Sequence, residues 1–471
     1  MIKKINIKIL LAIIIVATVG YILISSLIGD DKIGENKFSY LKSFLNNEQK
    51  EQIKKIIFPY KVISKQEQRI SQLTKIAMQQ KQNRKILQPI LLNLELNKKK
   101  LASDIETEER VISLSNNLTL KKFHLLSGFY YGINIEFPGS GYIDFYDDNI
   151  FVLSSRGVLA FRKDLSTDKE SFKQIKNNID EFIGEKQLGK GNWFSIKDLY
   201  ILNNKVFISY TEEIEEDCWN TSVIFGNINF EKIEFKKLFS PIQCVHSINN
   251  IDKEFNAHQS GGKIISLDND HILLTIGDYR SRHLAQNKKS LNGKIIKINI
   301  KNNQYQMISM GHRNPQGLYF DEENKFVLET EHGPLGGDEI NLIEISKIED
   351  NKIQNYGWPI SSVGKHYVGT KEKYEKYPLH DSHSEYGFIE PLKSFYPSIG
   401  ISEIVKIDQN KYVVGSMKRK SLYFFELNDQ REIIGMEKVE VHERIRDLRF
   451  HNNRLYLFME NTASVGIINL S

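Results

Sequence analysis

The chain has 471 residues, of which 40% are apolar and 11% aromatic, so it can form a large hydrophobic core and is not a disordered protein. The net charge is +5, but residues 32–122 alone carry 19 Lys and Arg against 9 Asp and Glu. The rest of the chain is therefore acidic, which gives no support for nucleic-acid binding by the main domain.

The first segment predicts a membrane anchor. Ile9 to Gly29 is a run of 21 residues without a charge, and a helix of that length rises about 30 Å, the thickness of a bilayer core. Three lysines precede the run and two aspartates follow it, so the positive-inside rule exports everything after Asp31. A cleavable signal peptide is the alternative, although the run ends in LISSLIGDD and lacks a typical cleavage site. We expect residues 1–31 to be a single-pass signal anchor and the following domain to be periplasmic.

Residues 32–122 have a helical composition. No glycine occurs between Gly34 and Gly128, and Lys, Gln, Glu, Leu and Ile dominate. Apolar residues recur three or four apart, as one helix face requires: Ile70, Leu73, Ala77, Ile86, Ile90 and Leu94. We expect a membrane-proximal helical stalk through which copies of the chain could associate. A poorly ordered tether with partial helicity is the alternative, because heptads are not sustained.

The chain has two cysteines, Cys218 and Cys244, too few for a metal cluster or a disulfide scaffold. In an exported domain they can form one disulfide. Two buried free thiols are the alternative, because spacing alone does not show that the two residues are close.

After Phe123 the apolar pattern changes to period two. Six segments share alternating apolar residues, a polar turn and a second apolar run, as β-hairpins do: 142–155, 196–210, 263–278, 317–333, 403–417 and 445–460. Most of their spacings equal the length of a four-stranded blade. We therefore predict that residues 123–471 form an all-β, six-bladed propeller. A β-sandwich is less suitable, since it would not need six similar hairpins.

Loops from every blade meet at one end of a propeller channel, so a site there can combine distant residues. His258 precedes the first strand of one hairpin and Asp278 ends the second, which places both at the same end. A carboxylate can hold one nitrogen of a histidine while the other nitrogen acts as a base. A purely structural pair is the alternative reading.

The segment GHRNPQG places Arg313 and Asn314 before another inner strand, on a turn stiffened by the following proline. In EHGPLGGDE, which follows the partner strand, the main-chain oxygens of Gly333 and Pro334 could ligate a hard cation such as Ca²⁺. A structural β-turn and an ordinary Gly-Pro turn are the alternatives for these two segments.

Three late cations complete the set of candidates. Lys418 ends the fifth hairpin, and Arg444 and Arg446 begin the sixth. Residues two apart on a strand share a side, so the two arginines would form a cationic pair. Facing the channel, they would repel each other and imply an anionic ligand; on the outer surface they would be unremarkable solvated charges.

In order along the chain, the motifs HQSGGKI, TIGD, GHRNPQGL, EHGPLGGDEINLI, NYGWP, SMKRKSLY and RIRDL closely resemble those of the soluble glucose dehydrogenase and sorbosone (aldose sugar) dehydrogenase family. That family uses pyrroloquinoline quinone (PQQ) and folds as a six-bladed propeller. The resemblance covers about residue 135 to the C-terminus. It implies a quinoprotein that oxidises the C1 hydroxyl of a sugar by hydride transfer to the quinone.

The resemblance also implies a role for each matched residue. His258 is the expected general base, Asp278 the group that orients it, and Arg313 the residue that stabilises negative charge on the quinone oxygen. Asn314 lies beside Arg313 on the cofactor, and Gly333 and Pro334 hold Ca²⁺. A cationic clamp on the carboxylates of PQQ completes the set, formed by Lys418, Arg444 and Arg446.

Some features depart from the family pattern. The first blade, LSSRGVLAF, has no convincing match to the glutamine that the family places on the quinone. The substrate-facing aromatics are not assignable, and the loose candidates are Tyr367, Tyr374, Tyr377, Tyr386 and Tyr396. The sugar and the electron acceptor are therefore open. A non-catalytic binding propeller, resembling hedgehog-interacting proteins, is the alternative to an enzyme.

Overall fold

The computed structural model describes residues 79, 82–83, 86–134, 137, 139–163, 165 and 171–470. The predicted anchor (residues 1–31) and most of the predicted stalk lie outside these residues. Within the described part of the chain, no helix combines the length and the hydropathy that a bilayer crossing needs. The chain divides into two units, residues 1–82 and 83–471, and the second contains the fold described below.

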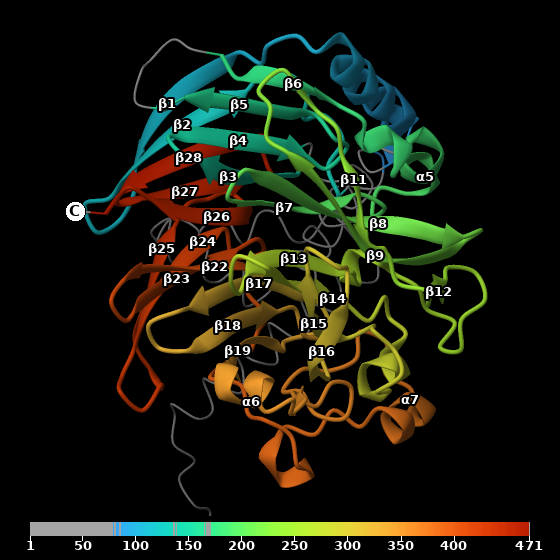
Figure 1. The fold of residues 1–471 in the computed structure, drawn as a ribbon. Helices are drawn as coiled ribbons and strands as arrows, with labels where there is room; N and C mark the ends of the chain where they lie inside the picture. The colour runs from blue at the N-terminus through green and yellow to red at the C-terminus, as the bar shows by residue number, and fades with distance from the viewer. Residues whose placement is uncertain are drawn as a thin grey trace, which may run out of the picture. The chain divides into compact units, whose positions relative to one another are not determined.

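Six largely antiparallel sheets make up the fold (Figure 1). One blade, which we call the closing blade, contains β1 (Thr107–Ser113), β2 (Thr119–Leu125), β26 (Ile445–His451), β27 (Arg454–Met459) and β28 (Ser464–Asn469). The next contains β3 (Gly141–Tyr146), β4 (Asn149–Ser154), β5 (Leu159–Lys163), β6 (Lys173–Asn177) and β10 (Lys232–Ile233). A third contains β7 (Ile196–Leu202), β8 (Lys205–Glu215), β9 (Cys218–Asn227), β11 (Lys236–Phe239) and β12 (Val245–His246).

The other three blades follow in chain order. The fourth contains β13 (Gly261–Ser266), β14 (His271–Ile276), β15 (Lys294–Asn299), β16 (Tyr305–Met310) and β20 (Gln354–Asn355). The fifth contains β17 (Pro315–Asp321), β18 (Phe326–Glu331), β19 (Asp338–Glu344) and β21 (Lys393–Phe395). The sixth contains β22 (Ile401–Asp408), β23 (Lys411–Ser416), β24 (Ser421–Leu427) and β25 (Ile433–Glu440).

Short helices lie in the connections between strands. The α-helices are α5 (Glu185–Lys190), α6 (Ile345–Glu349) and α7 (Lys371–Lys376). The 3₁₀ helices are η1 (Ile179–Glu181), η2 (Ala257–Gln259), η3 (Arg282–Gln286) and η4 (Ser384–Tyr386). Of these elements, η2 matters most for the site, because it carries His258.

The six predicted hairpins are all present, and they supply the two innermost strands of the six blades. The innermost strands contact one another in the cyclic order β3, β7, β13, β17, β22, β26 and back to β3. The prediction of a six-bladed propeller is therefore confirmed. Apolar side chains on the two faces of each sheet pack against the neighbouring blades and form the core between them.

The predicted end of the stalk at residue 122 is wrong. Residues 107–113 and 119–125 form β1 and β2, and β2 pairs antiparallel with β28, placing Leu120 opposite Ile468. The N-terminal strands thereby close the ring against the C-terminal strands. Sequence reasoning missed β1 because its residues are mostly exposed, so its side chains carry no apolar alternation.

The predicted helical character holds for residues 86–101, but the predicted apolar face does not face the core. Ile86, Ile90 and Leu94 are 65%, 54% and 49% exposed, whereas Leu92 and Leu96 are buried in the core beside the blade of β3 to β6. Glu95 is buried on the same side as these leucines, and accepts hydrogen bonds from the main-chain N–H groups of Tyr130 and Tyr131. The periodic pattern predicts that the helix has an apolar face. It did not show which face packs on the core, because the polar Glu95 lies on the buried face.

A buried ionic network fills the centre of the ring. Lys263 lies 2.8 Å from Asp198 and 2.9 Å from Asp447, and it also pairs with Glu403. Arg449 contacts the carboxylates of the same cluster, 3.0 Å from Asp447 and 3.3 Å from Glu403. These residues come from β7, β13, β22 and β26, so the network joins four blades.

Loss of one cation from this network should destabilise the fold strongly. We expect Lys263→Met to lower the free energy of unfolding by about 3–5 kcal/mol, because three buried carboxylates lose a partner. Urea denaturation monitored by tryptophan fluorescence measures this change.

The matched control is Lys301→Met. Lys301 forms an exposed ion pair with Asp270, which should contribute less than about 1 kcal/mol. Equal effects of the two substitutions would show that the central network does not hold the blades together.

Candidate active site

A cavity of 240 Å³ lies at the end of the channel where the inner strands begin. Its lining includes five predicted site residues: His258, Arg313, Asn314, Arg444 and Arg446. They arrive from loops and strand starts at β13, β17 and β26, nearly two hundred residues apart in the sequence. Tyr367, one of the loosely predicted aromatics, lies in the same lining.

The cavity is strongly cationic. Five cationic side chains contribute to its lining: Lys197, Arg280, Arg313, Arg444 and Arg446. None of the described residues that line it is acidic. Such a lining favours an anionic ligand, because the positive charges of several Lys and Arg side chains in a concave site add.

A larger cavity, of 710 Å³, lies at the other end of the inner strands. Its lining includes Asp144, Asp321 and Glu403, and it contains no predicted site residue. Size therefore does not identify the site, and the smaller cavity is the one in which the candidate catalytic groups meet.

His258 is positioned by η2. The side chain of Asn256 accepts a hydrogen bond from the main-chain N–H of His258 at 2.8 Å and caps this helix. The ring nitrogen Nε2 lies 3.1 Å from the main-chain oxygen of Ile133, so a proton on Nε2 would be donated there and Nδ1 would be left as an acceptor. Burial, and secondly the nearby Lys197 ammonium, lower the pKa of His258 to about 4. The imidazole is therefore neutral at pH 7 and can accept a proton.

Asp278 does not orient His258 as predicted. It is fully buried behind the cavity, where its carboxylate accepts hydrogen bonds from Trp358 Nε1 at 2.9 Å and from the main-chain N–H of Arg280 at 2.8 Å. Gln259 links it to Arg313: the amide nitrogen donates to Asp278 at 3.0 Å and the amide oxygen accepts from Arg313 Nη2 at 2.9 Å. Asp278 thus supports Arg313. The hairpin spacing placed it at the correct end of the blade without showing which way its side chain points.

Arg313 is held from several sides. Its Nη1 donates to the main-chain oxygen of His332 at 2.7 Å, and its guanidinium carbon lies 5.5 Å from the ring centroid of Trp358 and 6.0 Å from that of Tyr367. The adjacent Asn314 accepts at Oδ1 from the main-chain N–H of Gly261 at 3.2 Å. The turn is therefore held by several contacts, and the proline after Asn314 restricts its backbone as predicted.

Arg444 and Arg446 share a buried acid that the sequence analysis missed. Glu460 accepts from Arg444 Nε at 3.0 Å and from Arg446 Nε at 2.6 Å, and it also accepts from Ser140 Oγ at 2.8 Å. The inference that the arginines repel each other unless an anionic ligand binds is therefore wrong, because one carboxylate already lies between them. Glu460 is the last residue of the predicted hairpin 445–460, opposite the arginines, and that position was the available signal.

Other predicted residues lie outside the lining of the cavity. Lys418 is exposed, and its neighbour Met417 faces the cavity instead. Gly333 and Pro334 are buried just after β18, and the main-chain oxygen of Pro334 is directed to Gly337 N at 3.3 Å and to Ser398 Oγ at 3.4 Å. In this arrangement Pro334 does not present its oxygen as a free cation ligand.

Lys197 and His332 are two of the cavity residues to which the sequence assigned no role. Lys197 is buried and donates to the main-chain oxygens of Trp193 at 2.8 Å and Ala257 at 3.1 Å, which brings its charge beside His258. His332 lines the cavity with an Nε2 that is shielded from solvent and has no described hydrogen-bond partner. Burial lowers the pKa of His332 to about 4. His332 lies within the motif EHGPLGGDE and Lys197 within the predicted hairpin 196–210, but without the fold nothing distinguished them from structural residues.

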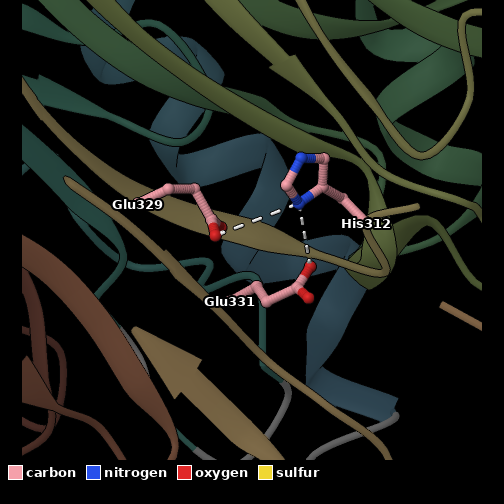
Figure 2. A group of neighbouring side chains, drawn as sticks. All are labelled: His312, Glu329 and Glu331. Atoms are coloured by element: carbon pink, nitrogen blue, oxygen red, sulfur yellow. Dashed lines mark ion pairs between the residues drawn. The ribbon is translucent and has the colours of Figure 1, made fainter. Parts of the chain in front are cut away.

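A second polar cluster lies beneath the turn that carries Arg313. His312, Glu329 and Glu331 are buried together, and the two carboxylates approach the same ring nitrogen of His312 (Figure 2). Glu331 also accepts a hydrogen bond from the main-chain N–H of Arg313 at 2.8 Å. The cluster thus contacts the site from below without lining the cavity.

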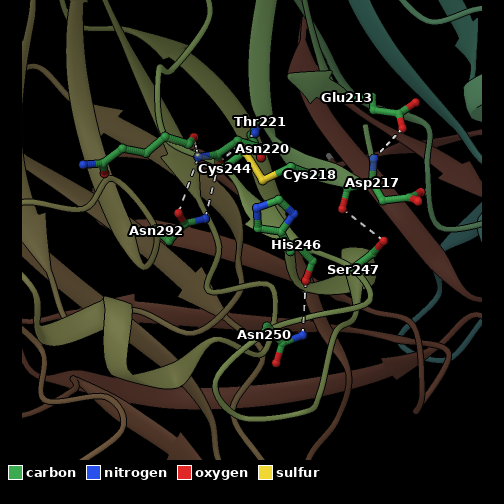
Figure 3. The surroundings of a disulfide bond; sticks show 11 residues. Glu213, Asp217, Cys218, Asn220, Thr221, Cys244, His246, Ser247, Asn250 and Asn292 are labelled. Atoms are coloured by element: carbon green, nitrogen blue, oxygen red, sulfur yellow. Dashed lines mark hydrogen bonds between the residues drawn. A yellow bond between two sulfur atoms is a disulfide. The ribbon is translucent and has the colours of Figure 1, made fainter. Parts of the chain in front are cut away.

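A disulfide joins Cys218 and Cys244, which settles the pairing that the sequence left open (Figure 3). It fastens β12 to β9, where Val245 lies opposite Trp219. From β9, the hydroxyl of Thr221 donates to the main-chain oxygen of Ser260 at 2.7 Å. The disulfide therefore braces the strand that supports the loop after His258.

The comparisons with known proteins agree with this fold and site. The family profile named Glucose / Sorbosone dehydrogenase matches residues 144–468. The chain belongs to this family. An aldose sugar dehydrogenase of Escherichia coli is 24% identical over 288 residues, covering 56% of this chain and 72% of the relative. An uncharacterised protein of Synechocystis is 29% identical over 219 residues, covering 40% of this chain, so the chain spans about half (50%) of that relative's length.

Solved structures show the same fold. A glucose dehydrogenase crystal structure superposes with a TM-score of 0.56 and 21% identity, covering 70% of this chain and 96% of that one. The PQQ-bound aldose sugar dehydrogenase of Streptomyces coelicolor superposes with a TM-score of 0.51 and 16% identity, covering 74% of this chain and 98% of that one. At these identities the likeness establishes the propeller architecture.

Removal of the disulfide should loosen the His258 side of the site. Cys218 and Cys244 are 26 residues apart, so in the chain-entropy account the double variant Cys218→Ser/Cys244→Ser should be less stable by about 3 kcal/mol. Thermal denaturation followed by circular dichroism measures the loss. The same result is expected for wild-type protein unfolded under reducing conditions; full stability in both experiments would contradict a bracing role.

Proposed function

We propose that this protein is a membrane-anchored, PQQ-dependent aldose dehydrogenase whose propeller lies outside the cytoplasm. The observation that carries the proposal is a cavity with five cationic groups and no described acid in its lining, beside a histidine that is neutral at pH 7. Membership of the glucose/sorbosone dehydrogenase family and the names of the relatives support the same activity.

The residues of the cavity suit PQQ, a flat molecule with three carboxylates. Arg444 and Arg446 together carry one positive charge more than Glu460 neutralises. The unpaired Nε2 of His332 offers one more polar contact. When bound, PQQ would supply the acceptor for the hydride that leaves C1 of the sugar.

The chain's own residues would manage the proton and the charge. His258 would take the proton of the C1 hydroxyl at Nδ1, the nitrogen that has no described protein partner. Arg313, held by Gln259 and the oxygen of His332, would stabilise negative charge that develops in the cavity. Tyr367, at the rim and 57% exposed, offers an aromatic face to a sugar ring.

The proposal gives Ca²⁺ no role and places the propeller outside the cytoplasm. Of the Ca²⁺ ligands predicted at Gly333 and Pro334, the main-chain oxygen of Pro334 already faces two donors, Gly337 N and Ser398 Oγ, so we assign Ca²⁺ no step. An extracytoplasmic propeller is supported by the disulfide, because such bonds persist in oxidising compartments, and by the apolar run Ile9 to Gly29.

Activity measurements on the full-length chain test the proposal. With PQQ added, the purified protein should reduce an artificial dye when aldoses are supplied, and His258→Ala should lower kcat by at least about 100-fold while PQQ still binds. His271→Ala, in a histidine paired to Asp268 at a distant turn, is the matched control and should retain activity. A protein that binds PQQ but oxidises no sugar or alcohol would instead be a non-catalytic binding propeller.

The pH profile tests the role of Lys197. A base works when unprotonated, so kcat/KM should fall as the pH drops through the pKa of His258. The Lys197 ammonium contributes to the depression of that pKa, and Lys197→Met should therefore shift the acid limb of kcat/KM to higher pH than in the wild type. PQQ affinity, measured separately by fluorescence titration, distinguishes this effect from loss of cofactor. An acid limb that stays in place would mean that another group accepts the proton.

A further inference from the structure

The buried cluster of His312, Glu329 and Glu331 has the arrangement of a metal site. One ligand atom from each residue lies within 4.8 Å of the others, and the side chains are at most 4% exposed. The Nδ1 atom of His312 is 3.6 Å from Glu331 Oε2 and 3.9 Å from Glu329 Oε2. Both separations are too long for a hydrogen bond. They are close to the ~3.4 Å expected between two atoms that bind the same ion at about 2.1 Å in tetrahedral geometry.

The ring nitrogen of His312 that faces the two carboxylates has no hydrogen-bond partner in the described part of the chain, whereas each facing carboxylate oxygen accepts one bond, Glu329 Oε2 from Asn341 and Glu331 Oε2 from the main-chain N–H of Arg313. His312 Nδ1 and Glu329 Oε1 have no hydrogen-bond partner among the described residues. The other ring nitrogen of His312, Nε2, lies 2.9 Å from Ser309 Oγ, to which it can donate a proton. Nδ1 would then direct a lone pair toward two carboxylates. Facing lone pairs are unfavourable unless a proton or a cation lies between them.

The charge of the cluster also indicates a bound cation. No lysine or arginine in the described part of the chain forms an ion pair with Glu329 or Glu331. Asn341 donates to Glu329 Oε2 at 3.0 Å, which orients that carboxylate without neutralising it. Two buried acids without a compensating cation are costly, and a bound divalent ion would remove that cost.

We propose that His312, Glu329 and Glu331 bind a divalent transition-metal ion, Zn²⁺ or Mn²⁺, at a structural site beneath the mouth of the propeller. One imidazole nitrogen and two carboxylates are ligands of these ions, whereas Ca²⁺ takes six to eight oxygens. A water molecule could complete the coordination. The site is separate from the cavity and does not depend on the proposed dehydrogenase activity.

The proposed ion would affect the cavity through one hydrogen bond. Glu331 accepts from the main-chain N–H of Arg313, and His312 directly precedes Arg313 in the chain. An ion that fixes both His312 and Glu331 would therefore fix the turn that carries Arg313 and Asn314. In this role the ion positions cavity residues, and none of its ligands would touch the substrate.

Metal analysis of the full-length chain tests the proposal. After chelation, reloading with Zn²⁺, Mn²⁺ or Ca²⁺ and desalting, elemental mass spectrometry should find about one equivalent of Zn²⁺ or Mn²⁺ per chain. Glu329→Gln should weaken retention by more than about 100-fold, since even the loss of a partner outside the ligand shell costs 10–100-fold in metal affinity. Glu322→Gln, in an exposed acid on the turn after β17, is the matched control and should retain the ion.

Two further measurements report whether the metal binds at this cluster. Co²⁺ loading should give visible absorption bands in the wild type that are absent from Glu329→Gln, and Zn²⁺ should raise the Tm of the wild type alone. If Glu329→Gln does not fold, the metal content of the wild-type protein decides by itself. A wild type that retains neither ion would show that protons hold the cluster together, and equal retention by wild type and Glu329→Gln would place the ion elsewhere; either result overturns the proposal.

Discussion

The propeller depends on how its innermost strands are joined, because those strands belong to different sheets and do not form a ladder with one another. Carboxylates replace the missing ladder. Asp447 accepts from the main-chain N–H of Ile143 in the next blade at 2.9 Å, and Asp198 accepts in the same way from Ile264 at 2.8 Å. Lys263 lies between these two acids. Each acid therefore pairs a backbone group of a neighbouring blade while its own charge is neutralised at the centre.

The arginines of the cavity are held by buried groups behind its lining. Each positive group in the cavity that has been traced to a partner is held from behind: Arg313 by Gln259 and Asp278, and Arg444 and Arg446 by Glu460. The acids lie behind the lining of the cavity, whereas the arginines are part of the lining. The arginines are therefore fixed in place while their charge stays available to a ligand. Burial, and secondly the neighbouring Lys197, keep the imidazole of His258 neutral in the same cavity.

The sequence predicted the architecture better than the details of the site. Period-two hairpins identified all six blades, because each inner hairpin carries the alternation that packing on a core demands. Motif positions also brought Arg313 and His258 to one cavity. Side-chain direction was the part that failed: Asp278 faces Trp358, and Lys418 faces solvent. Spacing predicts which end of a strand a residue occupies, but rotamers and neighbouring blades determine where its side chain points. Glu460 shows a second limit: an acid at the end of the adjacent strand pairs with Arg444 and removes the repulsion inferred from the sequence.

The pairing of β2 with β28 also has a bearing on how the molecule is made. The closing blade combines strands that lie more than three hundred residues apart, so its hydrogen bonds cannot form until Ser464–Asn469 has left the ribosome. Until then β2 has an unpaired edge, open to chance pairing with other chains. Lys121 and Lys122 lie on that strand, and charged residues at an unpaired strand edge oppose such pairing until β28 has been made.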